Sequence, residues 1–242
     1  MQKYRYYDLI MAFFVAVLIT SNIASSAKVV DLGITIFDFW YIPPVHLAFD
    51  GGTLFFPLAY VLGDILTEVY GYKAARRVIW TGFIVLSLSS LFFFVLSRLP
   101  GDSVWESYAG TAAYNSILGG ISSGGIVAAS LSGYLIGSFS NSAMLSWMKA
   151  YTKGRFLWLR VVGSSLVGEL LDSLVFMFVA CVTGVFEWEL FTSLALTNYF
   201  LKITIEVIVI PFTFLGVKKL NKAEKGATFD PGILSCPGDR TE

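Results

Sequence analysis

Seven ionisable residues lie inside apolar segments of this 242-residue chain. A charged side chain at the centre of a membrane-spanning helix costs at least ~2.5 kcal/mol on insertion scales, so such positions are candidates for function. They are the acids Asp64, Glu68, Glu169, Asp172 and Glu206 and the lysines Lys28 and Lys202. Because carboxylates outnumber lysines, this set suits a polar neutral or cationic solute, or a proton relay.

The helical spacing of these residues predicts a binding site. Glu169 and Asp172 are three residues apart, and Asn198, Lys202 and Glu206 follow at steps of four, so each group shares one helix face. Lys202 could instead form a structural ion pair with the first group or with Glu206. We expect the centre of the site to comprise Asn22, Glu169, Asp172, Asn198, Lys202 and Glu206. A carboxylate could bind the donor edge of a purine-like ring. We favour Glu169 over Glu206 for this role, because Lys202 lies one helical turn from Glu206.

Asp64 and Glu68 form a second acidic pair, one helical turn apart. They precede a basic stretch with Arg76 and Arg77, so we expect Asp64, Glu68 and Arg76 to form an inner gate or release path. A structural alternative is that Glu68 pairs with Arg76 or Arg77 and fixes the end of the helix. Lys28, near the end of an apolar segment, could simply extend its amine to the membrane surface.

Composition indicates the elements that must position these residues. Hydrophobic residues make up 56% of the chain and charged residues 14%, whereas soluble domains carry about 25% charged residues. A membrane span needs roughly 20 apolar residues. We therefore predict an all-α integral membrane domain over residues 1–225, followed by a flexible cytoplasmic tail over 226–242. Its six transmembrane helices are expected at about 9–30, 52–71, 78–97, 117–139, 161–184 and 190–217.

Basic residues alternate between the connecting segments. The N-terminal stub, the second and fourth loops and the tail carry Lys and Arg, whereas the other three loops share only Arg98. Cytoplasmic loops are enriched in Lys and Arg. The alternation predicts that both termini lie in the cytoplasm.

Small residues form two faces on the fourth expected span. They are Gly120, Gly124, Ala128 and Ser132 on one face and Gly125, Ala129, Gly133 and Gly137 on the other. Small residues let helix backbones approach closely. The faces could serve internal packing or a homodimer interface.

Enzyme chemistry finds little support in the sequence. The segment 120–124 matches a serine nucleophile pattern, but that pattern needs a strand–turn–helix context and a histidine base, and the sole histidine is His46. The sequence contains neither a P-loop nor a cluster of histidines and cysteines with metal-ligand spacing. The net charge of zero indicates no nucleic-acid partner. We therefore expect no cofactor, no metal and no catalytic residue.

Several motifs together resemble the queuosine precursor transporter family, a vitamin-uptake-type family. They are Pro57-Leu58-Ala59-Tyr60 before Asp64, Thr67-Glu68-Val69-Tyr70-Gly71-Tyr72 with Arg76-Arg77, Gly168-Glu169 with Asp172-Ser173, and Asn198-Tyr199 with Lys202, Glu206 and Pro211. The resemblance covers nearly the whole chain from Asn22 to the basic tail.

This resemblance implies import of 7-deazaguanine compounds across a bacterial plasma (inner) membrane. The implied solutes are 7-cyano-7-deazaguanine, 7-aminomethyl-7-deazaguanine or queuine. It also implies a six-helix fold similar to the substrate-binding subunits of energy-coupling-factor transporters. Two alternatives stay open: a binding subunit that needs a separate ATP-driven module, and an intramembrane enzyme.

Overall fold

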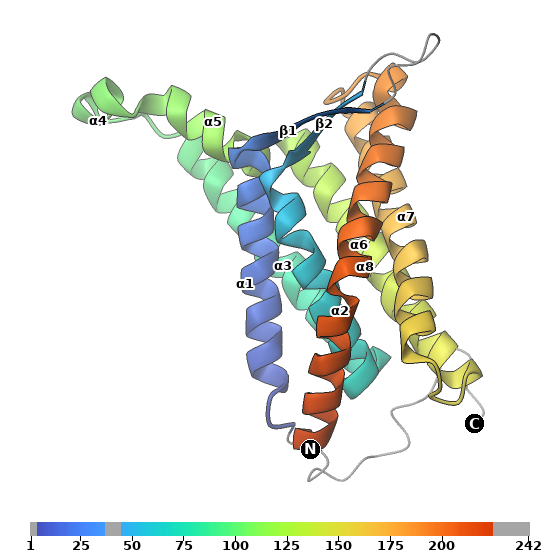
Figure 1. Ribbon diagram of the computed structural model, residues 1–242. Coiled ribbons are helices and arrows are strands. Elements are labelled where there is room, and N and C mark those ends of the chain that lie inside the picture. The colour runs from blue at the N-terminus through green and yellow to red at the C-terminus, as the bar shows by residue number, and fades with distance from the viewer. Residues whose placement is uncertain (1–3, 37–44, 225–242) are drawn as a thin grey trace.

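A computed structural model describes residues 4–36 and 45–224 of the chain as a helical bundle (Figure 1). The helices are α1 (Tyr7–Ala27), α2 (Phe56–Tyr70), α3 (Tyr72–Ser97), α4 (Ser103–Tyr108), α5 (Gly110–Ser122), α6 (Gly124–Tyr151), α7 (Leu157–Val182) and α8 (Phe191–Glu224). Short 3₁₀ turns precede α2 (Gly51–Leu54) and α8 (Trp188–Leu190). The expected tail, residues 226–242, lies outside the described residues.

Five helical segments are long and apolar enough to cross a membrane. They are Tyr7–Ser25, Tyr72–Ser97, Gly110–Tyr151, Leu157–Val182 and Leu194–Glu224. Large hydrophobic side chains such as Phe92, Phe178 and Phe212 are exposed on their outer surfaces, which in a membrane would face lipid. The chain is thus a multi-pass helical membrane protein.

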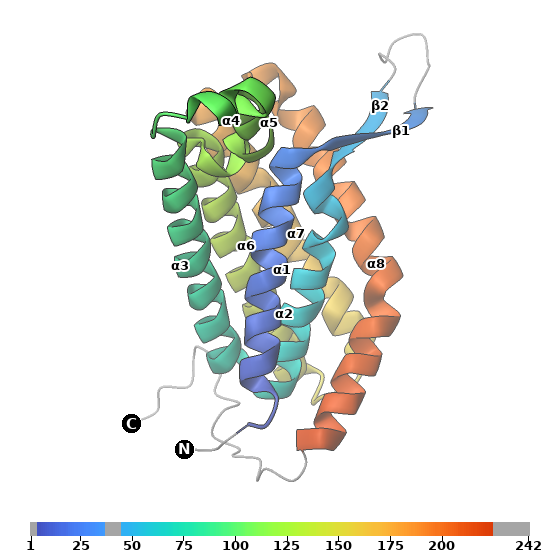
Figure 2. The same cartoon turned by 90° about the vertical axis from the view of Figure 1, so that its left-hand side faces the viewer.

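Helix α2 is the expected span that is not among these five. Its 15 residues extend about 22 Å at 1.5 Å per residue, whereas the hydrocarbon core is about 30 Å thick. Most of its residues are buried, because α1, α3, α6 and α8 pack around it (Figure 2). A helix enclosed by protein can carry acids such as Asp64 and Glu68, which lipid would not tolerate.

A two-stranded antiparallel hairpin interrupts the helical architecture, which the sequence analysis did not anticipate. Strand β1 (Val29–Ile36) pairs with β2 (Val45–Asp50), with a register irregularity between Asp31 and Thr35. Helix α1 ends at Ala27, where the expected span ran to residue 30. β-Branched residues are frequent in β1 (VVDLGITI), and such residues favour strands.

The fourth expected span, 117–139, contains a helix break. Ser123 has extended backbone angles and separates α5 from α6, which continues to Tyr151. Small residues of α6 face α7: a Cβ added to Gly137 would lie 2.6 Å from the Cβ of Asp172 and 3.0 Å from the carbonyl oxygen of Gly168. The face that includes Gly125, Gly133 and Gly137 therefore serves internal packing. The homodimer interface stays an untested prediction.

Both termini of the described chain meet at one end of the bundle, named here the termini end, opposite the hairpin end (Figure 1). The Glu224 carboxylate accepts hydrogen bonds from the backbone N–H groups of Arg5 and Tyr6 and from the Tyr70 hydroxyl. Tyr4, Tyr7 and Tyr70 pack edge to face beside it. These contacts join the first, second and last helices.

Candidate functional site

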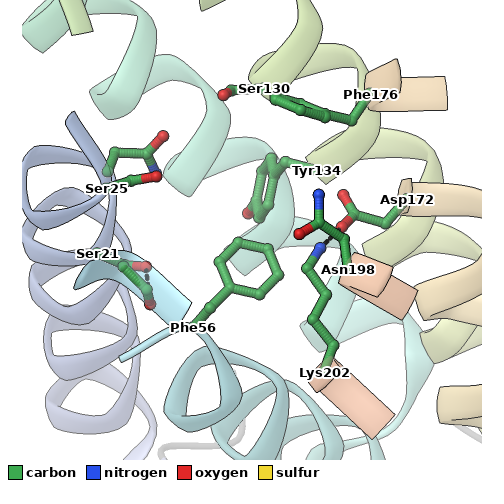
Figure 3. A pocket seen from close by; sticks show the side chains of 11 residues that line it. Ser21, Ser25, Phe56, Ser130, Tyr134, Asp172, Phe176, Asn198 and Lys202 are labelled. Carbon is green, nitrogen blue, oxygen red and sulfur yellow. Dashed lines mark hydrogen bonds and ion pairs between the residues drawn. The ribbon is translucent and has the colours of Figure 1, made fainter. Parts of the chain in front are cut away.

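A cavity of about 100 Å³ lies inside the bundle, between α1, α2, α6, α7 and α8 (Figure 3). Its lining is formed by Ser21, Asn22, Ser25, Gly52, Phe56, Ser130, Tyr134, Asp172, Phe176, Asn198 and Lys202. Four residues of the predicted binding site are among them: Asn22, Asp172, Asn198 and Lys202.

An ion-pair network forms the polar wall of this cavity. The Lys202 amine contacts the Asp172 carboxylate directly and lies 3.5 Å from Glu169 Oε2. We name Glu169, Asp172 and Lys202 the cavity cluster. Glu169 is buried behind Lys202 and does not line the cavity. Of the alternatives open from the sequence, Lys202 thus pairs with the acids of α7 and not with Glu206.

Aromatic rings form the apolar wall. Phe56 of α2, Tyr134 of α6 and Phe176 of α7 all line the cavity (Figure 3). The Lys202 amine lies 4.5 Å from the centre of the Phe56 ring, within cation–π range. The Tyr134 hydroxyl donates to the Ile79 carbonyl at 3.0 Å, which holds its ring in place. Acid, amide and aromatic groups therefore surround one small space.

A larger cavity of about 360 Å³ adjoins the first toward the hairpin end. The two share the lining residues Asn22, Ser25, Ser130, Phe176 and Asn198. The larger cavity is mostly apolar, with contributions from Leu86, Leu131 and Met177 among others. Solute sites are commonly apolar hollows with a few placed polar groups, and the two cavities together have that character.

A second ion-pair network lies toward the termini end. Glu68 Oε1 lies 2.8 Å from Arg160 Nη2 and 3.3 Å from Lys149 Nζ. We name Glu68, Lys149 and Arg160 the termini-end cluster. The Arg160 side chain also donates to the Arg155 carbonyl and to Thr152 Oγ1, so its terminal nitrogens are hydrogen-bonded although the side chain is buried. Arg76 is exposed and is not brought to Glu68.

Two further acids lie in the interior, and neither pairs with a lysine or arginine of the described residues. Asp64 Oδ1 accepts from Asn141 Nδ2 at 2.8 Å, and Glu206 accepts from the Ser165 hydroxyl. The second oxygen of each carboxylate is buried and has no hydrogen-bond partner within residues 4–36 and 45–224. Neither residue lines the central cavity.

The sequence analysis missed several residues of this arrangement. Phe56, Tyr134 and Phe176 were not distinguishable from other aromatics in apolar segments, because no spacing marks a ring that faces a cavity. Asn141 is a polar residue in an apolar helix, as Asn198 is, and could have been found by that criterion. From the sequence, Arg160 belongs to a basic loop and opens the fifth expected span, but nothing there predicts that it pairs with Glu68 or that it is almost fully buried.

Buried polar cavities inside a bundle of membrane-crossing helices are typical of proteins that bind or carry small solutes across membranes. A family model described as a putative vitamin uptake transporter matches residues 50–216. The chain belongs to this family, and it is accordingly a transporter and not an enzyme.

Two curated relatives refine this assignment. The probable queuosine precursor transporter of Bacillus subtilis (strain 168) is 26% identical over 178 residues, which cover 73% of this chain and 72% of the relative. The queuosine precursor transporter of Escherichia coli (strain K12) is 26% identical over 188 residues, covering 77% and 76%. No solved structure matches the chain.

Proposed function

We propose that this protein imports a queuosine precursor, a 7-deazaguanine compound, and binds it in the central cavity. The observation that carries the proposal is that a carboxylate, two amides and three aromatic rings line one cavity. The names of the two relatives support the same solute class. The preferred solute is 7-cyano-7-deazaguanine, 7-aminomethyl-7-deazaguanine or queuine.

The chemistry of a deazaguanine ring suits these walls. Its amino and N–H donors can meet a carboxylate in a paired arrangement, and Asp172 is the carboxylate that lines the cavity. Asn198 and Asn22 can donate or accept, which suits a ring carbonyl. Phe56 or Phe176 would stack on the ring face. Glu169, which we expected from the sequence to bind the ring, would instead hold Lys202 in position.

The proposal also includes the topology. We infer six spans, with α2 as the sixth, and place the termini end in the cytoplasm because basic residues gather there. The termini-end cluster would then close the inner side, and the solute would enter from the hairpin end through the larger cavity. Cysteine-accessibility labelling tests this: a cysteine introduced at Asp102 should react from outside, and reaction only from the cytoplasm would overturn the topology.

An uptake experiment tests the function. We would express the chain alone in a bacterium unable to make queuosine precursors and unable to import them, and supply 7-cyano-7-deazaguanine. Restored queuosine in tRNA is the expected result. A chain carrying Asp172→Asn should fail to restore it, whereas the exposed-site control Glu106→Gln should succeed.

The alternatives predict different outcomes. A substrate-binding subunit would restore queuosine only when the ATP-hydrolysing and coupling subunits of an energy-coupling-factor transporter are supplied as well. The resemblance to such subunits makes this the second candidate. Absence of rescue in both backgrounds, with normal membrane levels of the protein, would overturn the proposed solute.

A further inference from the structure

The interior of the bundle holds more acids than bases. Five carboxylates are buried between the cavity and the termini end: Asp64, Glu68, Glu169, Asp172 and Glu206. Three cations reach them, namely Lys149, Arg160 and Lys202. Lys202 forms ion pairs with the two acids of the cavity cluster, and Lys149 and Arg160 both form ion pairs with Glu68. No lysine or arginine in the described part of the chain pairs with Asp64 or Glu206.

Keeping an isolated buried carboxylate ionised costs a large free energy. Transfer of a lone charge into a low-dielectric interior is so unfavourable that the group takes up a proton or a counter-ion instead. Asp64 is 1% exposed and Glu206 is 4% exposed. The two are close enough for their like charges to interact, so ionising both together is more unfavourable still. At least one of the two carboxylates must therefore bind a proton or another cation.

The imported solute cannot supply that charge from the central cavity, because neither carboxylate lines it. The spaces near them are small. One of about 20 Å³ is bordered not by Asp64 itself but by Tyr60, by its neighbour Gly63 and by its hydrogen-bond partner Asn141. One of about 10 Å³ is bordered by Glu206. A water molecule needs roughly 10–15 Å³. These spaces suit water and protons and not an organic cation.

The partners of both acids also suit a proton. Asn141 and Ser165 each present a hydrogen-bond donor to one carboxylate oxygen, and the second oxygen remains buried and unpaired. The Tyr60 hydroxyl is likewise buried and has no hydrogen-bond partner among the described residues. It interacts electrostatically with carboxylates of α2, α7 and α8, including Asp64 and Glu206. Such a hydroxyl could pass a proton between them.

We propose that Asp64 and Glu206 form a proton site that couples solute import to the proton gradient. This inference rests on the proposed function. A proton would enter with the solute from the hairpin end, bind one of the two carboxylates, and leave toward the termini end when the bundle opens there. The solute and the proton are thus carried together and no covalent bond changes.

Other ionisable groups surround this site and set its charge. Helix α2 itself contributes Tyr60 and Glu68, α7 contributes Glu169, Asp172 and Arg160, and α8 contributes Lys202. Helix α6 faces Asp64 with Asn141 and contributes Lys149 to Glu68. The side chains of α1 and α3 that border the small space are Phe14, Leu18 and Ile79, which carry no charge.

Proteoliposomes containing the full chain would test the proposal with radiolabelled 7-cyano-7-deazaguanine. With the wild-type protein and an acidic exterior, we expect accumulation above the external concentration, collapse of that gradient by a protonophore, and acidification of the lumen upon solute addition. Asp64→Asn and Glu206→Gln should lose accumulation and lumen acidification. Both should retain solute binding and exchange of internal for external solute, because the cavity lining is intact. Glu106→Gln is the matched control and should behave as wild type.

The outcomes separate this inference from the proposed function. If the wild-type protein neither binds nor exchanges the solute, the proposed function fails. If it exchanges the solute but responds to a sodium gradient, or to no ion gradient, the proton site is wrong while the function stands. Unchanged proton-driven accumulation in both variants would also remove Asp64 and Glu206 from the coupling. Retained exchange in the variants demonstrates that they are folded.

Discussion

The cavity cluster and the termini-end cluster are both ion-pair networks, but they differ in what they do in the molecule. Each cluster joins carboxylates to basic side chains, but the ratio of acids to bases differs. Two acids share Lys202 in the first, whereas two bases share Glu68 in the second. The first cluster borders the central cavity through Asp172 and Lys202, whereas no residue of the second lines that cavity. The Lys202 side chain is 18% exposed and the Arg160 side chain 1% exposed. An ion pair that borders a cavity can contact a solute, whereas an ion pair without such a space only holds helices together.

The largest effect is expected from Glu68→Gln. It would leave the buried Arg160 without its carboxylate, and breaking a buried pair in this way costs about 3–5 kcal/mol. We expect a large fall in the unfolding temperature of the purified protein in detergent. Lys202→Met, which strands the acids of the cavity cluster, should cost less, because water in the cavity can hydrate Asp172.

Lys149→Met serves as the control for this prediction. Its amine is 23% exposed and Arg160 would still neutralise Glu68, so the loss should stay within about 1 kcal/mol. A larger loss for Lys202→Met than for Glu68→Gln would mean that the cavity cluster is the structural one.

The next effect concerns solute affinity. Asp172→Asn should weaken binding of 7-cyano-7-deazaguanine by about 2–5 kcal/mol, because removal of a paired carboxylate leaves buried donors without an acceptor. Glu169→Gln should weaken it less, since Glu169 acts on the cavity through Lys202. Calorimetric titration of both purified variants measures the difference. If Glu169→Gln abolishes binding and Asp172→Asn does not, the ring is bound by Glu169, as the sequence alone predicted.

A smaller effect should come from the packing that holds the cavity wall. In Gly137→Ala, the new methyl group would lie 2.6 Å from Asp172 Cβ and 2.9 Å from the Tyr60 hydroxyl. Overpacking of this kind costs about 1–3 kcal/mol. We expect a lower unfolding temperature together with weaker solute binding. Gly63→Ala is the control, because its added Cβ meets nothing within 4 Å, and equal losses in both would contradict the packing argument.

The smallest effect is expected at a fully hydrated carboxylate. Hydrogen bonds from the Thr111 hydroxyl and backbone N–H lower the pKa of Glu106 below its usual value. The resulting stabilisation is present at neutral pH and is lost as the pH falls through that lowered pKa. The unfolding temperatures of wild type and Glu106→Gln should therefore converge between pH 7 and pH 3. A gap that widens on acidification would show that this bond does not stabilise the fold.

The sequence alone determined the membrane class, the family resemblance and which acids lie inside apolar helices, where the structure buries them. These follow from local properties: apolar length, the cost of a charge inside it, and helical spacing. It also predicted that Asp172, Asn198, Lys202 and Asn22 share a site, and all four line the central cavity. That they bind the solute stays a prediction.

Only the tertiary structure decided which charges meet. Glu68 pairs with Arg160, which is 92 residues away in the chain, and not with the nearby Arg76 or Arg77. The latter two side chains are exposed, whereas Arg160 is buried within α7 and lies 2.8 Å from Glu68. Helix packing likewise placed Glu169 behind Lys202 and paired neither Asp64 nor Glu206 with a lysine or arginine of the described residues. Spacing fixes the face of one helix, but the partner of that face depends on how the other helices are rotated and packed.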